Sequence, residues 1–232
     1  SRWKAGQKGV VILSCELIDN NGKELLKCVN QYIDDWKLGE DFKKWVNEEN
    51  VFCSTLVDRI VPGRIRDNAE VARLAEINGY DDPLTDVGEV FGVWVIEGPD
   101  GLEDRLPFKK AGCNVVFTQD VSPYKLRKVR MLNGAHTSMV LGAYLAGHEI
   151  VGDCMADANT RKYMSDALFN EIMPTLDLPK EDLKAFASAI FERFENPFID
   201  HELISICLNS VSKWKARVLP SVIDSFNANG KL

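Results

Sequence analysis

The chain has 232 residues, of which 45% are hydrophobic and 27% are charged, as in ordinary globular proteins. This composition excludes a disordered chain, a collagen-like repeat and a disulfide-stabilised miniprotein. The 28 basic and 35 acidic residues give a net charge of −7. That balance argues against a dedicated nucleic-acid-binding protein, because such a protein needs a basic face.

Cysteine and histidine usage argues against a metal site. The six cysteines are widely spaced and form no C-x-x-C pair, and the three histidines form no H-E-x-x-H motif, so we expect no zinc and no disulfide framework. No apolar run approaches the ~20 residues of a membrane helix, and the first residues lack the apolar core of a signal peptide. These observations predict a metal-free protein of the reducing cytoplasm.

The first half of the sequence alternates between strand and helix patterns. The aliphatic run 10–13 favours a central strand of a parallel sheet, covered on both faces. Further along we expect a helix over 25–36, an extended element over 51–61, a short helix over 71–77, and strands at 93–96 and 115–117. Strand, helix and strand in this order predict an α/β layer.

The second half contains only helical patterns. We expect helices over 126–146, 158–173, 179–194 and 202–218. The predicted fold class is therefore α/β followed by all-α, with a domain boundary near 118–123 that separates residues 1–120 from 121–232. No G-x-G-x-x-G or P-loop motif follows a strand, so the phosphate-binding half of a nucleotide-binding domain is missing.

Residues 121–148 contain no carboxylate but carry Lys125, Arg127, Lys128 and Arg130. A run of like charges is usually a solvated face. The alternative is an electropositive site for an anion.

The same stretch contains Lys128, Asn133 and His136. On an ideal α-helix, Asn133 lies about 140° from Lys128 and His136 about 80° from it, so all three could face one cleft. A lysine of lowered pKa can act as a general base, an amide can donate to an oxygen that gains charge, and an imidazole can orient either partner. The alternative is an amphipathic helix with one polar face.

Two more segments carry polar residues at positions of interest. Asn21 and Gly22 follow the first strand, where ligands of open α/β sheets bind, although Asn-Gly also serves simple turn geometry. Asp58 and Arg59 lie in an apolar element, where a charged pair is costly and has either a functional or a structural role.

Together these segments resemble the polyol-specific long-chain dehydrogenase/reductase family, also called the mannitol dehydrogenase family. The resemblance rests on Cys15 with Asn21-Gly22, on Val57-Asp58-Arg59-Ile60, and on Lys128-x4-Asn133-x2-His136. It implies the remainder of a Rossmann-like NAD-binding domain over 1–120 and a helical substrate-binding domain over 121–232. It also implies an internal fragment of a longer enzyme, because the family's glycine-rich cofactor segment has no counterpart here.

Finer details resemble the branch of this family that acts on tagaturonate. They are Cys15-Glu16-Leu17-Ile18-Asp19, residues 52–61 and 132–137, Asn196-Pro197-Phe198-Ile199-Asp200-His201, and Leu208-Asn209-Ser210 with Lys213. The resemblance implies NAD-dependent interconversion of D-tagaturonate and D-altronate in hexuronate catabolism. Fructuronate reduction or mannitol/polyol 2-dehydrogenation is the alternative within the family, and a non-catalytic helical interaction module is the alternative outside it.

By the same resemblance, Lys128 is the acid/base, Asn133 and Asn21 hold the substrate oxygen, and His136 orients the substrate or Lys128. Arg59 and Lys213 are expected to bind the substrate carboxylate. Asp58 is expected to bind the cofactor. The implied partners are a sugar acid and NAD(H), with no metal, no nucleic acid and no membrane.

Overall fold

The computed structural model describes residues 1–230, which form two compact units. Unit 1 contains Ser1–Asp58 and Gly92–Lys125, and unit 2 contains Arg59–Phe91 together with the chain from Leu126 onward. The segment Arg59–Phe91 therefore groups with the helical part of the protein, although it interrupts the α/β part in the sequence.

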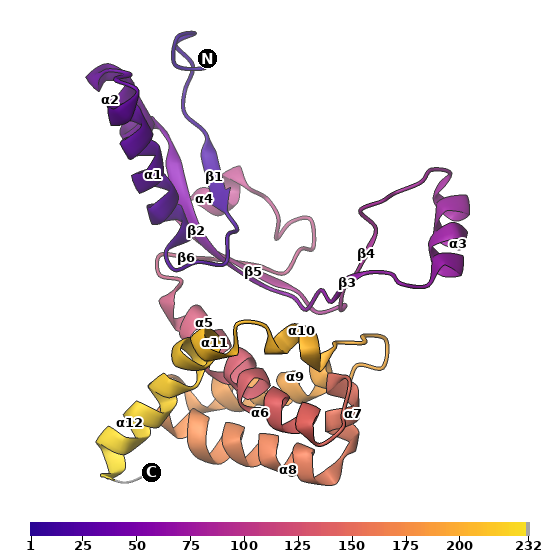
Figure 1. Ribbon diagram of the computed structural model, residues 1–232. Helices are drawn as coiled ribbons and strands as arrows, with labels where there is room; N and C mark the ends of the chain where they lie inside the picture. Colours follow the sequence, from indigo (N-terminus) through magenta and orange to yellow (C-terminus); the bar gives the residue numbers. More distant parts are fainter. Residues whose placement is uncertain (231–232) are drawn as a thin grey trace. The chain divides into compact units, whose positions relative to one another are not determined.

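Unit 1 is built on a four-stranded sheet of order β1-β2-β5-β6 (Figure 1). The strands are β1 (Val11–Ser14), β2 (Val51–Asp58), β5 (Val93–Glu97) and β6 (Val115–Thr118). β1 pairs with β2 in parallel, β2 with β5 in antiparallel, and β5 with β6 in parallel. The α/β layer is thus confirmed. The expected central place of residues 10–13 is wrong for the described residues, since β1 is an edge strand of a mixed sheet.

Helices α1 (Asn21–Asp35), α2 (Glu40–Glu49) and α4 (Leu102–Arg105) accompany this sheet. The buried side chains of Cys53, Ile96, Leu102 and Val115 form its apolar cluster. These residues come from β2, β5, β6 and α4, so burial of one sheet face holds the four elements together.

Helix α1 begins where it touches the backbone of β2. Gly22 lies in its first turn, and a Cβ atom added there would lie 2.4 Å from the carbonyl carbon of Cys53 and 2.5 Å from its oxygen. Asn20, just before the helix, has a left-handed backbone (φ 50°). The turn is thus made at Asn20, while Gly22 permits a close approach that only glycine allows.

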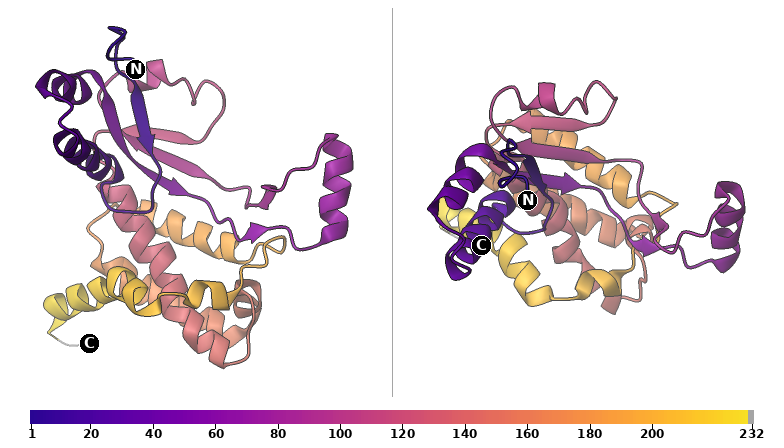
Figure 2. Two further views of the ribbon diagram at one scale, coloured as in Figure 1. Left: turned by 45° about the horizontal axis from the view of Figure 1, so that its top comes forward. Right: turned by 90° about the horizontal axis from the view of Figure 1, so that it is seen from above.

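Unit 2 consists mainly of helices (Figure 2). They are α6 (Gly134–Leu145), α7 (Val151–Ala156), α8 (Ala158–Asp166), α9 (Lys180–Phe194), α10 (Leu203–Cys207), α11 (Ser210–Arg217) and α12 (Leu219–Asn229). The segment Arg59–Phe91 adds the two-stranded pair β3 (Gly63–Arg64) and β4 (Asp86–Val87) and helix α3 (Asn68–Asn78). The core is apolar and close-packed, with Met131, Met164, Leu168, Ile190 and Leu203 almost fully buried.

Three predicted helices, those over 126–146, 158–173 and 202–218, are not continuous α-helices. The element expected over 202–218 is two helices, α10 and α11, because Asn209 has a left-handed backbone (φ 58°) that an α-helix excludes. The element expected over 126–146 consists of α5 (Ser122–Arg127), the π-helix η1 (Lys128–Asn133) and α6. A second π-helix, η2 (Ala167–Ile172), and the 3₁₀ turn η3 (Met173–Thr175) follow α8.

Within residues 1–230, no helix combines the length and the hydropathy needed to span a lipid bilayer.

The contact at Gly22 predicts a large effect of one methyl group. We expect Gly22→Ala to lower the free energy of unfolding by about 2 kcal/mol or more, because backbone atoms of β2 would have to move. Gly142→Ala is the matched control, since a Cβ there meets open space, and it should stabilise α6 by ~0.5–1 kcal/mol. Thermal or denaturant unfolding measures both. Equal effects of the two substitutions would contradict the close approach.

Candidate active site

Lys128 and Asn133 are the first and last residues of the π-helix η1. A π-helix bonds residue i to residue i+5, so residues five apart in the sequence lie about one helical turn apart. The two side chains therefore share a helix face, whereas an α-helix would separate them by about 140°. Both residues are half-buried. The sequence-based angle of about 140° assumed α-helical geometry, which η1 does not have.

Arg130 anchors this π-helix. Its buried guanidinium donates from Nε to Ser221 Oγ (2.7 Å), and from Nη2 to Thr175 Oγ1 (3.1 Å) and Asp224 Oδ2 (2.6 Å). Ser221 and Asp224 lie on α12, and Thr175 ends η3. π-helices are rare and frequently found at functional sites. The bonds from η3 and α12 to Arg130 explain how this one is held in place.

His136, in the first turn of α6, is 5% exposed. Its ring stacks on Phe194, with centroids 3.8 Å apart and planes at 7°, and the ring of His201 meets it edge-on at 5.1 Å. Within residues 1–230, Nε2 of His136 is buried and has no hydrogen-bond partner. A buried polar atom without a partner costs about 1–3 kcal/mol, so Nε2 is an atom that a ligand could satisfy.

Burial and nearby cations lower the pKa of both histidines. Desolvation is the main cause that places the pKa of His136 well below 6.5, and His201, Arg217, Arg193 and Lys213 add to it. Desolvation also lowers the pKa of His201, against an opposing effect of Glu89. A neutral imidazole has one donor and one acceptor nitrogen, so His136 can orient a hydroxyl or an amine.

Helix α11 carries two cations near these histidines. Lys213 Nζ donates to the carbonyl oxygen of Ile206 (2.8 Å), and Arg217 Nη1 to Thr137 Oγ1 (3.3 Å). Burial lowers the pKa of both groups, and Arg217 lowers that of Lys213 further. Like charges one helical turn apart repel each other, and an anion bound there would relieve the repulsion.

Other predicted residues lie elsewhere. Arg59 is exposed, follows β2, and donates from Nε to the carbonyl oxygen of Glu89 (2.8 Å). Asp58 is buried at the carboxyl end of β2. Within the basic stretch 121–148, Lys125 pairs with Asp19 and Arg130 with Asp224.

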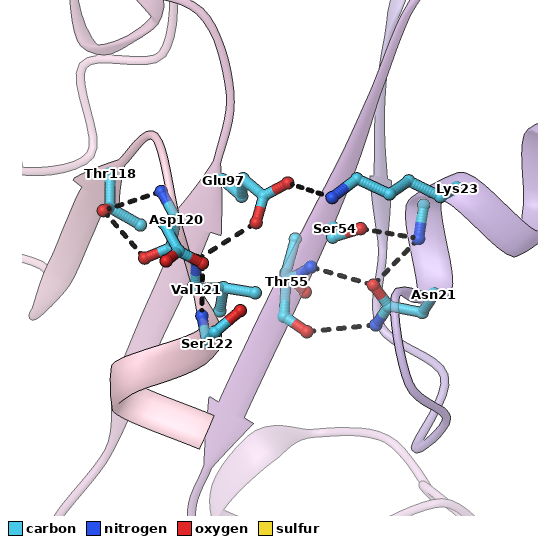
Figure 3. Close-up of polar contacts among 10 residues, drawn as sticks. Asn21, Lys23, Ser54, Thr55, Glu97, Thr118, Asp120, Val121 and Ser122 are labelled. Atoms are coloured by element: carbon cyan, nitrogen blue, oxygen red, sulfur yellow. Dashed lines mark hydrogen bonds and ion pairs between the residues drawn. The ribbon is translucent and has the colours of Figure 1, made fainter. Parts of the chain in front are cut away.

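Asn21 lies in unit 1, and its whole amide is used there (Figure 3). Nδ2 donates to the carbonyl oxygens of Glu16 (2.9 Å) and Thr55 (3.0 Å), and Oδ1 accepts from the backbone N–H groups of Gly22 and Thr55 (2.9 Å each). Since both amide hydrogens already have acceptors, this arrangement favours a structural role for Asn21 that fastens β1, α1 and β2 together.

A second polar network of unit 1 surrounds Glu97, at the end of β5 (Figure 3). Its carboxylate pairs with Lys23 Nζ (3.0 Å) and accepts from the backbone N–H of Val121 (3.1 Å). Glu97 thereby joins Lys23 to the start of α5. There the Asp120 carboxylate accepts from the N–H of Ser122 (2.8 Å). This bonding lowers the pKa of Asp120.

The carboxyl edge of β1 and β2 fits part of a dinucleotide. Ser14 is the last residue of β1, and its Oγ is buried with no hydrogen-bond partner in the described part of the chain. Ligands of open α/β sheets bind at such edges. No G-x-G-x-x-G turn is present to bind the pyrophosphate. The described residues thus fit the cofactor at one edge and lack its usual phosphate loop. They also contain no group of three His, Cys, Asp or Glu residues placed to hold a metal ion.

The residues that the sequence reasoning missed are those around His136: Phe194, His201, Arg217, Glu89 and Arg193. Phe194 is the last residue of the helix expected over 179–194, where it had no role of its own. His201 was part of the quoted motif Asn196–His201 without a role of its own, and that motif was the one available signal.

The order of an α/β unit and a helical unit with a lysine–amide–imidazole set is that of a two-domain dehydrogenase. Two family models match the chain: the mannitol dehydrogenase Rossmann domain over residues 1–110 and the mannitol dehydrogenase C-terminal domain over residues 120–232. The chain therefore belongs to the mannitol dehydrogenase family, and the predicted family and fold class are confirmed.

Similar proteins include altronate oxidoreductases. That of Enterobacter sp. (strain 638) is 47% identical over 98% of this chain and 47% of its own length, and that of Escherichia coli O6:K15:H31 is 47% identical over 97% of this chain and 46% of its own length. The chain thus spans about half the length of the curated relatives that it matches.

Two solved structures share the fold. A D-sorbitol dehydrogenase in substrate-free form has a TM-score of 0.83 and 29% identity over 98% of this chain and 46% of its own. The Pseudomonas fluorescens mannitol 2-dehydrogenase, in a ternary complex with NAD and D-mannitol, has a TM-score of 0.73 and 27% identity over 100% of this chain and 46% of its own.

The buried, neutral His136 predicts a loss of stability in acid. Its folded-state pKa lies below 6.5, so the unfolded chain binds the proton more tightly. Its contribution is complete above about pH 6.5 and decreases as the pH falls toward the folded-state pKa, by at most ~1.4 kcal/mol per pH unit. Denaturant unfolding of the intact protein between pH 7.5 and 5 should show a smaller slope for His136→Gln. The control variant His148→Gln should keep the slope, and an unchanged slope in His136→Gln would contradict the prediction.

Proposed function

We propose that the intact protein is an NAD-dependent oxidoreductase that interconverts D-tagaturonate and D-altronate in hexuronate catabolism. The observation that carries the proposal is the η1–α6 segment, in which a half-buried lysine and an amide share one face of a π-helix. The names of the altronate oxidoreductases support the choice of substrate. The domains of the mannitol dehydrogenase family and the NAD complex of a related structure support the cofactor.

When bound, the dinucleotide supplies or accepts the hydride. Ser14 and Asp58, at the carboxyl edge of β1 and β2, are the residues proposed to hold it. Lys128 gives a proton to the substrate oxygen in reduction and takes it back in oxidation. Asn133 donates an amide N–H to the same oxygen as it gains charge.

His136 orients the substrate through Nε2, a buried atom that has no hydrogen-bond partner among the described residues. Lys213 is the proposed partner of the uronate carboxylate, because burial and a neighbouring cation disfavour its charge in the absence of an anion. Arg59 is a weaker candidate for that role, because its Nε already donates to a backbone carbonyl. Asn133 is proposed to hold the substrate oxygen without Asn21, because both amide hydrogens of Asn21 are used within unit 1.

Fructuronate reduction and polyol 2-dehydrogenation are the competing activities, and a substrate panel separates them. The six cysteines are all free, which suits a reducing cytoplasm.

Because lysine and amide groups supply the proton and the polarisation, we expect activity to survive exhaustive chelation. Loss on chelation with recovery on added zinc would contradict the lysine mechanism.

Replacement of Lys128 tests the acid/base assignment. In the intact protein, Lys128→Ala should lower the turnover of tagaturonate with NADH by roughly 10²–10⁴-fold, the usual contribution of general acid–base catalysis. Lys215→Ala, an exposed lysine of α11, is the control and should leave turnover unchanged. Near-normal turnover of Lys128→Ala across the pH range would refute the assignment.

Asn133 provides a second test at the same oxygen. Removing one oxyanion donor costs about 10²–10³-fold in turnover, so Asn133→Ala should slow hydride transfer by that factor with a smaller effect on cofactor affinity. Asn133→Asp should be slower still at neutral pH, because a carboxylate repels the developing charge. Single-turnover kinetics measure both variants, and an Asp variant faster than the Ala variant would argue against a donor role.

A further inference from the structure

A buried ion pair in unit 2 connects helix α9 with the segment Arg59–Phe91. Arg193 donates from Nη2 to Glu89 Oε1 (2.7 Å) and from Nε to Oε2 (3.0 Å) and Oε1 (3.2 Å). The side chains of Arg193 and Glu89 are only 5% and 2% exposed. The guanidinium carbon of Arg193 also lies 4.2 Å from the ring centre of Phe91. The bidentate ion pair with Glu89 and the contact with the Phe91 ring therefore fix the Arg193 guanidinium in one orientation.

Glu89 is also bonded at its backbone and at its carboxylate to the other end of the same segment. Glu89 Oε1 accepts from the N–H of Ile60 (2.6 Å), and the N–H of Glu89 donates to the carbonyl oxygen of Ile60 (3.1 Å). The carbonyl oxygen of Glu89 accepts from Arg59 Nε (2.8 Å). The two ends of the Arg59–Phe91 segment are thus closed on each other at Glu89, and this closed end is joined to α9 by the ion pair.

Stability alone does not explain such a pair. Burying two charges costs about as much as their attraction returns, and well-packed apolar residues of similar volume stabilise a fold equally well or better. What the pair provides is orientation, because a bidentate arginine–carboxylate pair has a defined geometry.

The residue after Arg193 is Phe194, the ring on which His136 lies. Fixing Arg193 in the last turn of α9 fixes the rotation of that turn about the helix axis, and hence the plane of the Phe194 ring. The charges of the pair also reach the two histidines: Arg193 disfavours protonation of His136, and Glu89 favours protonation of His201.

We propose that Glu89 and Arg193 are positioning residues, which hold the Phe194 ring in the plane that seats the His136 imidazole for the substrate. Neither residue touches the substrate. The inference rests on the proposed function for its kinetic consequence, but the seating of the His136 ring is independent of which substrate is used.

The test replaces the pair while keeping volume and the bond to Ile60. In the intact protein, Glu89→Gln/Arg193→Met removes both charges together, so that no buried charge is left alone. The matched control is Glu195→Gln/Arg161→Met, which removes a partly exposed ion pair at the end of the same helix. The readouts are the melting temperature, the ¹H and ¹⁵N resonances of the His136 ring, and kcat and KM for tagaturonate.

We expect the Glu89/Arg193 variant to melt within a few degrees of the wild type. Its His136 ring protons should lose the upfield shift caused by the stacked Phe194 ring, and kcat should fall roughly 10- to 100-fold, the cost of a small misplacement of a positioned group. The control pair should change neither. If the wild-type protein does not turn over tagaturonate, the proposed function fails, while the ring resonances still decide the seating of His136.

Unchanged ring resonances in a folded Glu89→Gln/Arg193→Met variant would overturn the proposal. So would a kcat within twofold of wild type in a protein that does turn over tagaturonate. If the double variant fails to fold, the single variant Glu89→Gln, which keeps an oxygen for Ile60, is measured in the same way. Failure of both to fold would also overturn the proposal, because it would make the pair a requirement for stability.

Discussion

The π-helix η1 is the constraint on which the candidate chemistry depends. It changes the helical phase between Lys128 and Asn133 so that a proton donor and an amide share one face. A π-helix survives only where tertiary contacts stabilise it, and here Arg130 bonds to η3 and α12 from within the element. The small residue at the start of α6 is part of the same arrangement, since a Cβ at Gly134 would lie 3.2 Å from the carbonyl oxygen of Arg217.

The second feature of the site is a histidine kept neutral inside apolar surroundings. His136 has an aromatic ring on one face, a second imidazole at its edge and cations nearby. Because this environment lowers the pKa of His136, its proposed role is hydrogen bonding to the substrate. In the proposed mechanism Lys128 transfers the proton and Asn133 donates to the substrate oxygen.

Unit 1 uses its polar side chains mostly for its own architecture. The Asn21 amide is fully bonded to backbone groups of the turn and of β2, and Glu97 joins α1 to the start of α5. Among the described residues, the Ser14 hydroxyl and the Trp94 indole N–H of unit 1 are buried without a hydrogen-bond partner, and Ser14 lies at the edge where open α/β sheets bind ligands. Asn21 and Ser14 therefore differ in which polar atoms they leave available for a ligand.

The sequence by itself determined the order of an α/β part and a helical part, most strand and helix positions, and the family, because these depend on local periodicity and on residues at fixed spacing. The proposal that Lys128, Asn133 and His136 act as a set also came from their spacing in the sequence. Only the tertiary structure decided the π-helical phase of that set, the use of both Asn21 hydrogens, the break at Asn209 and the Glu89–Arg193 pair. The physical reason is that each of these depends on partners distant in the chain: a carbonyl on another strand, a hydroxyl on another helix, or a charge 104 residues away.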